Sequence, residues 1–304
     1  MKCNFAGRFK LDVHSVDEAG NVIPGSHRST GWFNNLITDV GLDLLGGSSQ
    51  NFLGRCFIGT SNTPPAVTDT ALGGQVAFAN RAGNPATSTG AAYVGAVCTY
   101  TFTQGAAVGN MQEIGIGTTG NSLFSRALIV DGNGDPTVLV LTSIDILTVT
   151  YELRLYPSQA DDTDTITDGA TTYTVVTRTA RGLNADQVVR WNADGPFGSN
   201  TTAYTTLYAG SIGPWTGVPS GANAHSGNNP TIGAYTPGSH QRSCTANFSI
   251  STGNVPGGLV YSAAVRPATS NVCCSLQASF APPIAKDNTK TLSLTWRISW
   301  GREP

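Results

Sequence analysis

The sequence carries few charged residues. Lys, Arg, Asp and Glu make up 12% of its 304 residues, and the formal net charge is −2. An average soluble domain has roughly 25% charged residues. So weak a field does not attract polyanions over a distance, and the Lys and Arg residues are scattered along the chain rather than clustered. We therefore predict no nucleic-acid binding.

Long apolar runs are also missing. Residues Met1–Arg8 lack the apolar stretch of a secretion signal, and no run reaches the about 18 apolar residues that a membrane-spanning helix needs. We therefore expect no membrane insertion. We also expect the protein to be made and kept in a cytoplasm before it reaches its place of work.

Cysteine is sparse, with six residues in the whole chain and no Cys-x-x-Cys motif. No His lies beside a Cys at the spacing of metal ligands. Cys273 and Cys274 are adjacent, so on a strand their side chains would point to opposite faces. Because a reducing cytoplasm disfavours disulfides, we predict free and mostly buried thiols, and no metal site.

Gly and Pro are abundant and together reach 52 residues (36 + 16). They occur with many Thr, Ser and Asn residues, a mixture typical of turn-rich β structure and of large assembly surfaces. Alternating apolar residues predict strands, most clearly over Leu147–Leu155 and also over Phe9–Val13. The regular spacing of turns predicts a mainly β fold of one or more antiparallel β-sandwiches. We also expect Leu123–Val130 to pair with Val138–Leu141.

One short helix is predicted over residues 35–46, where apolar residues recur at steps of three and four. Thr38 or Asp39 is a suitable N-cap, and Gly46-Gly47 ends the pattern. Gly41 weakens the helix by about 0.5 to 1 kcal/mol relative to Ala, so the helix needs a sheet to pack on. The residues that we expect to be buried there are Leu36, Ile37, Val40 and Leu44.

The polar stretch Ser158–Asp164 is the best domain boundary. It divides the chain into a β-sandwich with the short helix, residues 1–157, and a second β-rich half with long loops, residues 158–304. Leu147–Tyr151 is similar to Leu292–Trp296, and each follows a Gly-Asn turn. This similarity predicts an internal duplication, with a single sandwich that uses both edges as the rival.

Motifs of catalysis are missing. The sequence has no Gly-x-Ser-x-Gly, phosphate-binding loop, His-Glu-x-x-His or paired Cys and His, so we predict no enzyme and no cofactor. The paired carboxylates of a glycosidase can stand at any sequence spacing, so the sequence neither supports nor eliminates that class.

Two acidic segments are candidate cation sites. Asp131–Asp135 begins like a calcium loop, but Pro136 replaces the turn glycine and Thr142 the bidentate Glu, which favours a hairpin turn. Asp161–Asp168 lies in a Thr-rich linker, where acidic residues are more often solvated than bound to a cation.

Several aromatic residues of the second half are expected on exposed turns or in short strands. They could contact another subunit, stack on a sugar or cover the core. These candidate interface or ligand contacts are Trp191, Phe197, Tyr204, Tyr208 and Trp215.

Five segments together resemble a family of proteins. They are Phe33–Leu42 (FNNLITDVGL), Ile58–Leu72 (IGTSNTPPAVTDTAL), Gly109–Gly117 (GNMQEIGIG), Leu123–Ala127 (LFSRA) and Lys286–Leu292 (KDNTKTL). They are similar to segments of tail-associated proteins of tailed bacteriophages. Residues 158–240 match nothing in that family. The resemblance implies a structural role and supplies no catalytic residues.

This resemblance, together with the low-charge and turn-rich composition, implies a virion structural protein of a tailed bacteriophage, located in the tail after assembly in the host cytoplasm. It would build part of the tail tip or baseplate, or attach tail fibres. Its partners would be other virion proteins and itself, as a homo-oligomer with a trimer favoured.

Two alternatives stay open. A capsid decoration or neck protein would share the composition. A receptor-recognition module would bind a host-surface glycan through Trp191, Trp215 and the acidic residues Asp161–Asp168.

Overall fold

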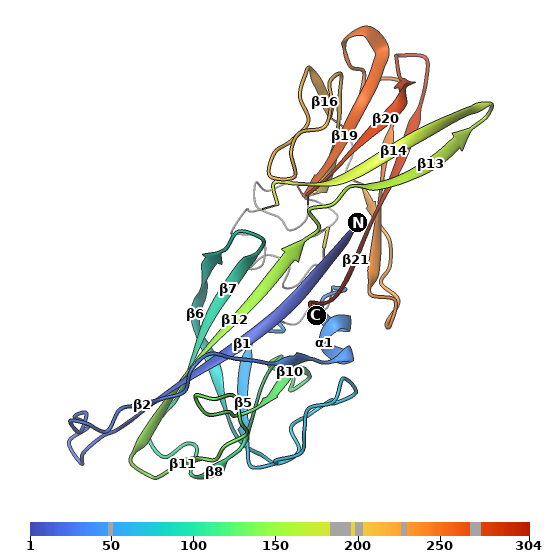
Figure 1. Cartoon of the computed structure of the whole chain (residues 1–304). Coiled ribbons are helices and arrows are strands. Elements are labelled where there is room, and N and C mark those ends of the chain that lie inside the picture. The colour runs from blue at the N-terminus through green and yellow to red at the C-terminus, as the bar shows by residue number, and fades with distance from the viewer. Residues whose placement is uncertain (48–50, 183–195, 198–202, 226–229, 268–274) are drawn as a thin grey trace. The chain divides into compact units, whose positions relative to one another are not determined.

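The structure is a computed structural model of the chain (Figure 1). It describes residues 1–47, 51–182, 196–197, 203–225, 230–267 and 275–304. About half of the chain, 54%, lies in strands and 3% in helices. The predicted mainly β, sandwich-like fold is therefore confirmed.

The chain divides into two compact units. The N-terminal unit contains Phe5–Ser88, Gly95–Arg154 and Arg302–Pro304, and the C-terminal unit contains Met1–Asn4, Thr89–Val94 and Leu155–Gly301. The main break falls between Arg154 and Leu155, within a strand and a few residues before the boundary that the polar stretch suggested. Short segments of each half thus belong to the other unit.

The N-terminal unit is built on one large sheet. Its strands follow the order β1-β12-β7-β6-β5-β9-β10-β4, with β2 and β3 paired to β1, and β8 and β11 form a separate pair. The strands are β1 (Lys2–Ser15), β2 (Arg28–Ser29), β3 (Phe33–Asn34), β4 (Leu36–Ile37), β5 (Arg55–Gly59), β6 (Gln75–Thr89), β7 (Val94–Phe102), β8 (Gly109–Met111), β9 (Glu113–Gly117), β10 (Leu123–Leu128), β11 (Leu139–Leu141) and β12 (Asp145–Pro157).

The C-terminal unit contains a six-stranded sheet in the order β13-β14-β20-β19-β15-β16, and its strands β17, β18 and β21 pair with one another in that order. Neither order repeats that of the N-terminal unit, and the internal duplication stays a prediction. The elements are β13 (Asp162–Asp168), β14 (Thr171–Ala180), β15 (Ala203–Tyr208), β16 (Asn223–His225), β17 (Thr231–Ile232), β18 (Gln241–Phe248), the 3-10 turn η1 (Pro256–Gly258), β19 (Leu259–Pro267), β20 (Ser275–Ala285) and β21 (Leu292–Arg302).

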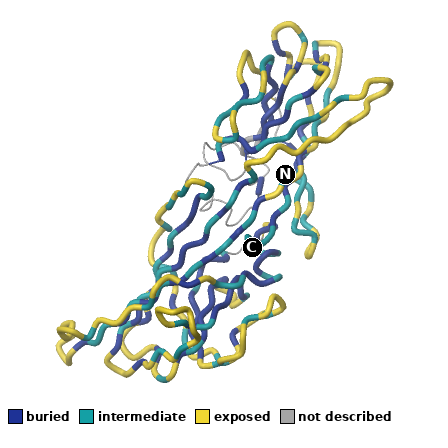
Figure 2. Tube along the Cα trace, viewed as in Figure 1, coloured by how far each residue is buried: buried dark blue, intermediate teal, exposed yellow. Residues whose placement is uncertain are grey.

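Buried and partly exposed residues alternate along the strands, as the sequence predicted, and the buried rows form the core. On β1 the residues Phe9, Leu11 and Val13 are buried while their neighbours stay partly exposed. On β12 every second residue from Leu147 to Leu155 is at most 1% exposed. Successive side chains of a strand point to opposite faces, so one row of each strand packs inside. Figure 2 shows this alternation as changes of colour along the trace.

The helix is shorter than predicted. Residues 36–37 form strand β4, and helix α1 spans only Asp39–Leu44. Thr38 is the N-cap as expected, because its Oγ1 accepts the Gly41 N–H at 2.9 Å. Of the four side chains expected to be buried, only Ile37 is; Leu36, Val40 and Leu44 are half-buried. The buried positions on the helix are instead Gly41 and Leu42.

One strand pairing was predicted wrongly. β10 pairs with β9 and β4, while β11 pairs with β8. Only a single bridge, Val130 to Pro136, closes the turn that was expected to join β10 to residues 138–141. The strongly buried strand β10 is covered on both edges by other strands, which sequence periodicity cannot show.

Four cysteines lie among the described residues, and all are free and buried, namely Cys3, Cys56, Cys98 and Cys244. Burial raises the pKa of the Cys98 thiol to about 11 and that of Cys244 to about 12. These thiols therefore stay protonated near neutral pH. Cys273 and Cys274 lie outside the described residues. Among the described helices, none is long and apolar enough to cross a membrane.

Candidate functional site

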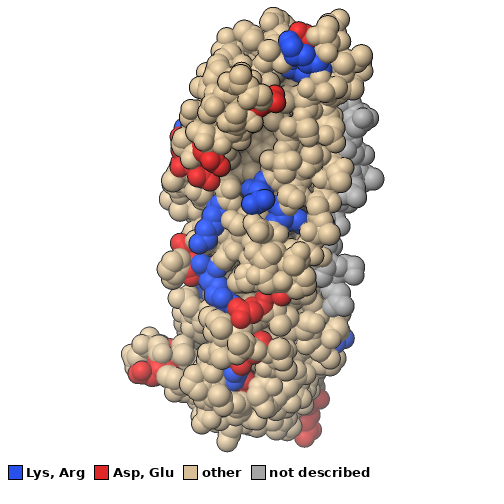
Figure 3. Space-filling view, turned by 90° about the vertical axis from the view of Figure 1, so that its right-hand side faces the viewer, with Lys and Arg blue, Asp and Glu red and all other residues tan. Residues whose placement is uncertain are grey.

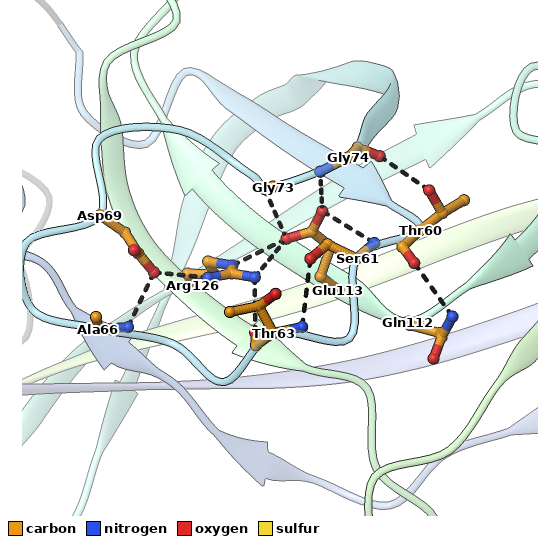
Figure 4. A network of polar contacts seen from close by, with 10 residues as sticks. All are labelled: Thr60, Ser61, Thr63, Ala66, Asp69, Gly73, Gly74, Gln112, Glu113 and Arg126. Carbon is orange, nitrogen blue, oxygen red and sulfur yellow. Dashed lines mark hydrogen bonds and ion pairs between the residues drawn. The ribbon is translucent and has the colours of Figure 1, made fainter.

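A long loop joins β5 to β6 in the N-terminal unit. Its residues 60–74 form neither helix nor strand, and most of their side chains are exposed. Loops of this length without secondary structure are uncommon in compact domains and are often functional. We call residues 60–74 the clamped loop, because a buried pair of charged residues fixes it from below (Figure 4).

Glu113 on β9 binds both ends of the clamped loop. Its side chain is completely buried. Oε1 accepts the N–H groups of Ser61 at 3.3 Å and Gly74 at 2.6 Å, and Oε2 accepts the N–H of Gly73 at 3.1 Å. The two ends of the loop, more than ten residues apart in sequence, are thus bonded to one carboxylate (Figure 4).

Arg126 on β10 binds the middle of the loop. Its guanidinium donates from Nε to Glu113 at 2.9 Å, from Nη1 to Asp69 at 2.7 Å and from Nη2 to the carbonyl of Thr63 at 2.8 Å. Arg126 is 3% exposed, so these bonds lie in a largely dry environment, where charge-assisted hydrogen bonds are strong.

The strand register explains why the two charges meet. Arg126 stands opposite Gly115 on β9, two residues from Glu113, so both side chains project from the same face of the sheet. Gly59 on the neighbouring strand β5 leaves room for the carboxylate. A Cβ atom there would lie 2.5 Å from Glu113 Oε1 and 2.6 Å from the carbonyl oxygen of Gly74.

Asp69 closes the network from within the loop. Its Oδ2 accepts the N–H of Ala66 at 2.9 Å as well as the Arg126 guanidinium. Partial burial raises the pKa of Asp69, but the Ala66 N–H and the positive charge of Arg126 outweigh burial and hold the pKa below its ordinary value. The carboxylate is therefore charged at neutral pH and completes the pairing of Arg126.

Further contacts hold the loop to its surroundings. The N–H of Asp39, at the start of α1, donates to the carbonyl of Val67 at 2.7 Å. Leu72 is buried with Phe57 and Leu123 in one apolar cluster. The loop is thus fixed at its ends, its middle and its apolar side, while Val67 keeps 39% of its surface exposed.

The geometry of the network suits a structural role, in which it holds the clamped loop in place, rather than a catalytic one. The three amides and Arg126 occupy the roughly four acceptor positions of the Glu113 carboxylate. A general base needs a free position directed at a substrate. What the arrangement offers instead is a rigid exposed loop that contains the pair Pro64-Pro65, whose fixed backbone angles reduce its freedom further.

Four of the five segments singled out in the sequence belong to this unit, and three of them supply the network. The loop comes from Ile58–Leu72, Glu113 from Gly109–Gly117 and Arg126 from Leu123–Ala127. The fourth, Phe33–Leu42, contributes Asp39. The resemblance did not point to a Glu–Arg pair. The sequence signal that could have found it is a charged residue within each of two apolar strands, because such residues are rarely buried without a partner.

The aromatic candidates of the C-terminal unit are not a common exposed surface. Phe197 is 1% exposed and Tyr208 7%, so neither ring is exposed and both cover the core, the use that the sequence left open beside contacts with a ligand or another subunit. Trp215 is half-buried, and its ring lies against Gly182, where a Cβ atom would approach to 2.2 Å. Trp191 and the side chain of Tyr204 lie outside the described residues.

The two acidic segments differ from cation loops. Asp131 Oδ1 accepts the N–H groups of Asn133 and Asp135, the pattern of a hydrogen-bonded turn. Asp161 forms a bidentate pair with Arg178 at 2.6 Å, and Asp162–Asp168 is the exposed strand β13. No group of three or more His, Cys, Asp or Glu residues in the described part of the chain is arranged to hold a metal ion.

No protein-family model, curated protein or solved structure matches this chain.

Proposed function

We propose that this protein is a structural protein of a tailed-bacteriophage virion and that the clamped loop is one of its binding surfaces. The protein builds part of the tail tip or baseplate, or attaches tail fibres, by contacts with neighbouring subunits. The observation that carries the proposal is the convergence of three segments of the phage-tail resemblance on one buried network that holds an exposed loop.

A preorganised loop is suited to such contacts. Binding costs less free energy when the binding segment is already ordered, because little conformational entropy remains to be lost. Val67 and the two prolines give the loop an apolar exposed part. Most of the surface drawn in Figure 3 is neither acidic nor basic, which suits subunit contacts that exclude water.

The loop alone is too small for a stable interface. A standard interface buries about 1,200 to 2,000 Å² of total surface, so other parts of the chain must take part. The partners are further copies of this chain, with a trimer as the favoured oligomer, and other tail proteins.

Incorporation into particles tests the proposal. In Val67→Glu a buried charge would oppose docking of the loop, so particles should contain much less of the variant than of the unmodified protein. Val22→Glu is the matched control: Val22 is 57% exposed in the turn after β1, and its particles should be normal. Quantitative mass spectrometry of purified particles measures both.

Two results contradict the proposal. Particles that lack the unmodified chain show that it is not a virion protein. Normal incorporation of Val67→Glu shows that the loop is not a binding surface. Antibody labelling of heads or necks instead of tail tips would favour the decoration or neck protein.

A further inference from the structure

A small polar pocket lies in the C-terminal unit, where β18 and β21 meet the loop of residues 233–240. Its volume is about 160 Å³. That is small beside the roughly 300 to 1,000 Å³ of typical ligand pockets, so it suits one sugar ring rather than a long peptide. The lining residues are Ala234, Thr236, Ser239, Gln241, Arg242, Ser243 and Arg297.

The two strands form the floor of the pocket. Ser243 of β18 stands directly opposite Arg297 of β21, so their side chains lie on the same face. On β21 the neighbours Trp296 and Ile298 are buried, which places their side chains on the opposite face. Arg297 is exposed and therefore points outward, into the pocket.

The wall of the pocket is a loop with fixed hydrogen bonds. The Gly233 N–H donates to the carbonyl of Ser243 at 2.9 Å, and Arg242 Nε donates to the carbonyl of Gly233 at 2.9 Å. The ring of Tyr235 packs against that of Trp300, with centroids 5.6 Å apart. The loop is held to both strands, so the pocket exists before any ligand binds.

The charge of the pocket is positive in a chain whose net charge is −2. None of the seven lining residues is a carboxylate, and Arg297 is the arginine on the face of the pocket, because Arg242 stands opposite Ile298 and donates to the Gly233 carbonyl. Among the described residues, the Arg297 guanidinium has no hydrogen-bond or ion-pair partner, although a guanidinium offers a planar set of donors that fits a carboxylate or phosphate.

The remaining polar groups suit a ligand rich in hydroxyls. Thr236, Ser239 and Ser243 carry hydroxyls, and Gln241 carries an amide, so the pocket presents both donors and acceptors around Arg297. A simple anion would use Arg297 alone, whereas a sugar that bears an acidic group also uses the hydroxyl and amide groups.

We propose that this pocket binds an acidic sugar, a hydroxyl-bearing ring with a carboxylate or phosphate, and that Arg297 pairs with the acidic group. The site is separate from the clamped loop and does not depend on the proposed virion function. It also differs from the glycan surface around Trp191, Trp215 and Asp161–Asp168 that the sequence suggested.

Calorimetric titration of the full chain with glucuronic acid, glucose 6-phosphate, glucose and inorganic phosphate tests the proposal. At least one of the two acidic sugars should bind, glucose should bind at least tenfold more weakly, and Arg297→Gln should weaken the acidic sugar at least tenfold. Lys290→Gln is the charge-matched control in the same unit, with 49% of its side chain exposed, and should bind like the unmodified protein. The affinity of Arg297→Lys for the acidic sugar should lie between those of the unmodified protein and Arg297→Gln, because Lys keeps the charge but lacks the planar set of donors.

The arms of the experiment separate the ligand types. Binding of glucuronic acid alone identifies a carboxylate as the acidic group, and binding of glucose 6-phosphate alone identifies a phosphate. The proposal is overturned if neither acidic sugar binds, or if Arg297→Gln binds the acidic sugar as tightly as the unmodified protein does. It is also overturned if inorganic phosphate binds as tightly as the acidic sugars. Circular dichroism of each variant confirms that a loss of binding does not reflect unfolding.

Discussion

The clamped loop and the β13–β14 hairpin are both exposed segments rich in small polar residues, but they are ordered in different ways. Every residue of β13 is exposed, and its order comes from backbone pairing with β14 along Asp162–Asp168 (Figure 2). The clamped loop has no such ladder of its own. Its order comes from Glu113 and Arg126 beneath it.

The comparison predicts how strongly a single substitution destabilises each segment. A ladder spreads its stabilisation over many weak contacts, so one exposed side chain contributes little. A buried charged pair concentrates stabilisation in two side chains, because removing one leaves the other charged and desolvated. Single substitutions should therefore affect the loop strongly and the hairpin weakly.

The largest effect is expected for Glu113→Gln. The substitution keeps the size of the side chain but leaves Arg126 with Asp69 as its only carboxylate partner, and it places an NH₂ group against backbone donors. We expect a loss of about 3 to 5 kcal/mol in the free energy of unfolding. Chemical denaturation measures it.

Glu18→Gln is the control for this prediction. Glu18 is exposed in the turn after β1, and its substitution should change stability by less than about 0.5 kcal/mol. A loss of under 1 kcal/mol for Glu113→Gln would show that the buried carboxylate does not hold the loop. The double variant with Arg126→Gln should cost less than the sum of the two single changes, since it leaves no fully buried charge unpaired; Asp69, which loses Arg126, keeps 23% of its side chain exposed.

An intermediate effect is expected for Thr38→Ala. Thr38 is buried, caps α1 through the Gly41 N–H and donates to the carbonyl of Leu123 at 3.0 Å. Losing this cap should cost about 1 to 2 kcal/mol. The same substitution on the hairpin, Thr165→Ala, should cost no more than about 0.5 kcal/mol because Thr165 is exposed. Equal costs at the two positions, measured by denaturation, would contradict the comparison.

The smallest effect, and the one with a distinct pH dependence, is expected for Asp69→Asn. The folded-state pKa of Asp69 is lowered, so its stabilising effect is present above the unfolded pKa, near 3.9, and is lost as the pH falls through the folded value. The variant should lose about 1 kcal/mol at neutral pH, and the difference from the unmodified protein should vanish at low pH.

Stability curves from about pH 2 to 7 measure this difference. Asp162→Asn, on exposed β13, is the matched control and should follow the unmodified protein. A constant difference between Asp69→Asn and the unmodified protein at all pH values would show that the ion pair with Arg126 is not its cause.

The sequence predicted the strands that alternate cleanly and missed those that do not. Leu147–Leu155 has one apolar row, and it is the core row of β12. β6 has Gly, Pro and Asn within Gln75–Thr89, and β13 is almost wholly Asp and Thr, so neither shows a core pattern. Their order comes from neighbouring strands, which local sequence does not encode.

The candidate site was less predictable for a similar reason. The motif residues were visible, but the meeting of Glu113, Arg126 and the loop depends on the register of β9, β10 and β5. For Phe197 and Tyr208 the sequence could not decide between solvent and core, because an aromatic beside a turn has the same local pattern in both cases.

Amide hydrogen exchange at Gly73 and Gly74 tests the clamp most directly. Both N–H groups donate to Glu113 and to no strand, so we predict slow exchange in the unmodified protein and fast exchange in Glu113→Gln, under conditions where the amides of β12 stay protected in both. Fast exchange of these two amides in the unmodified protein would contradict the account, because it would show that the loop is not held by the buried carboxylate.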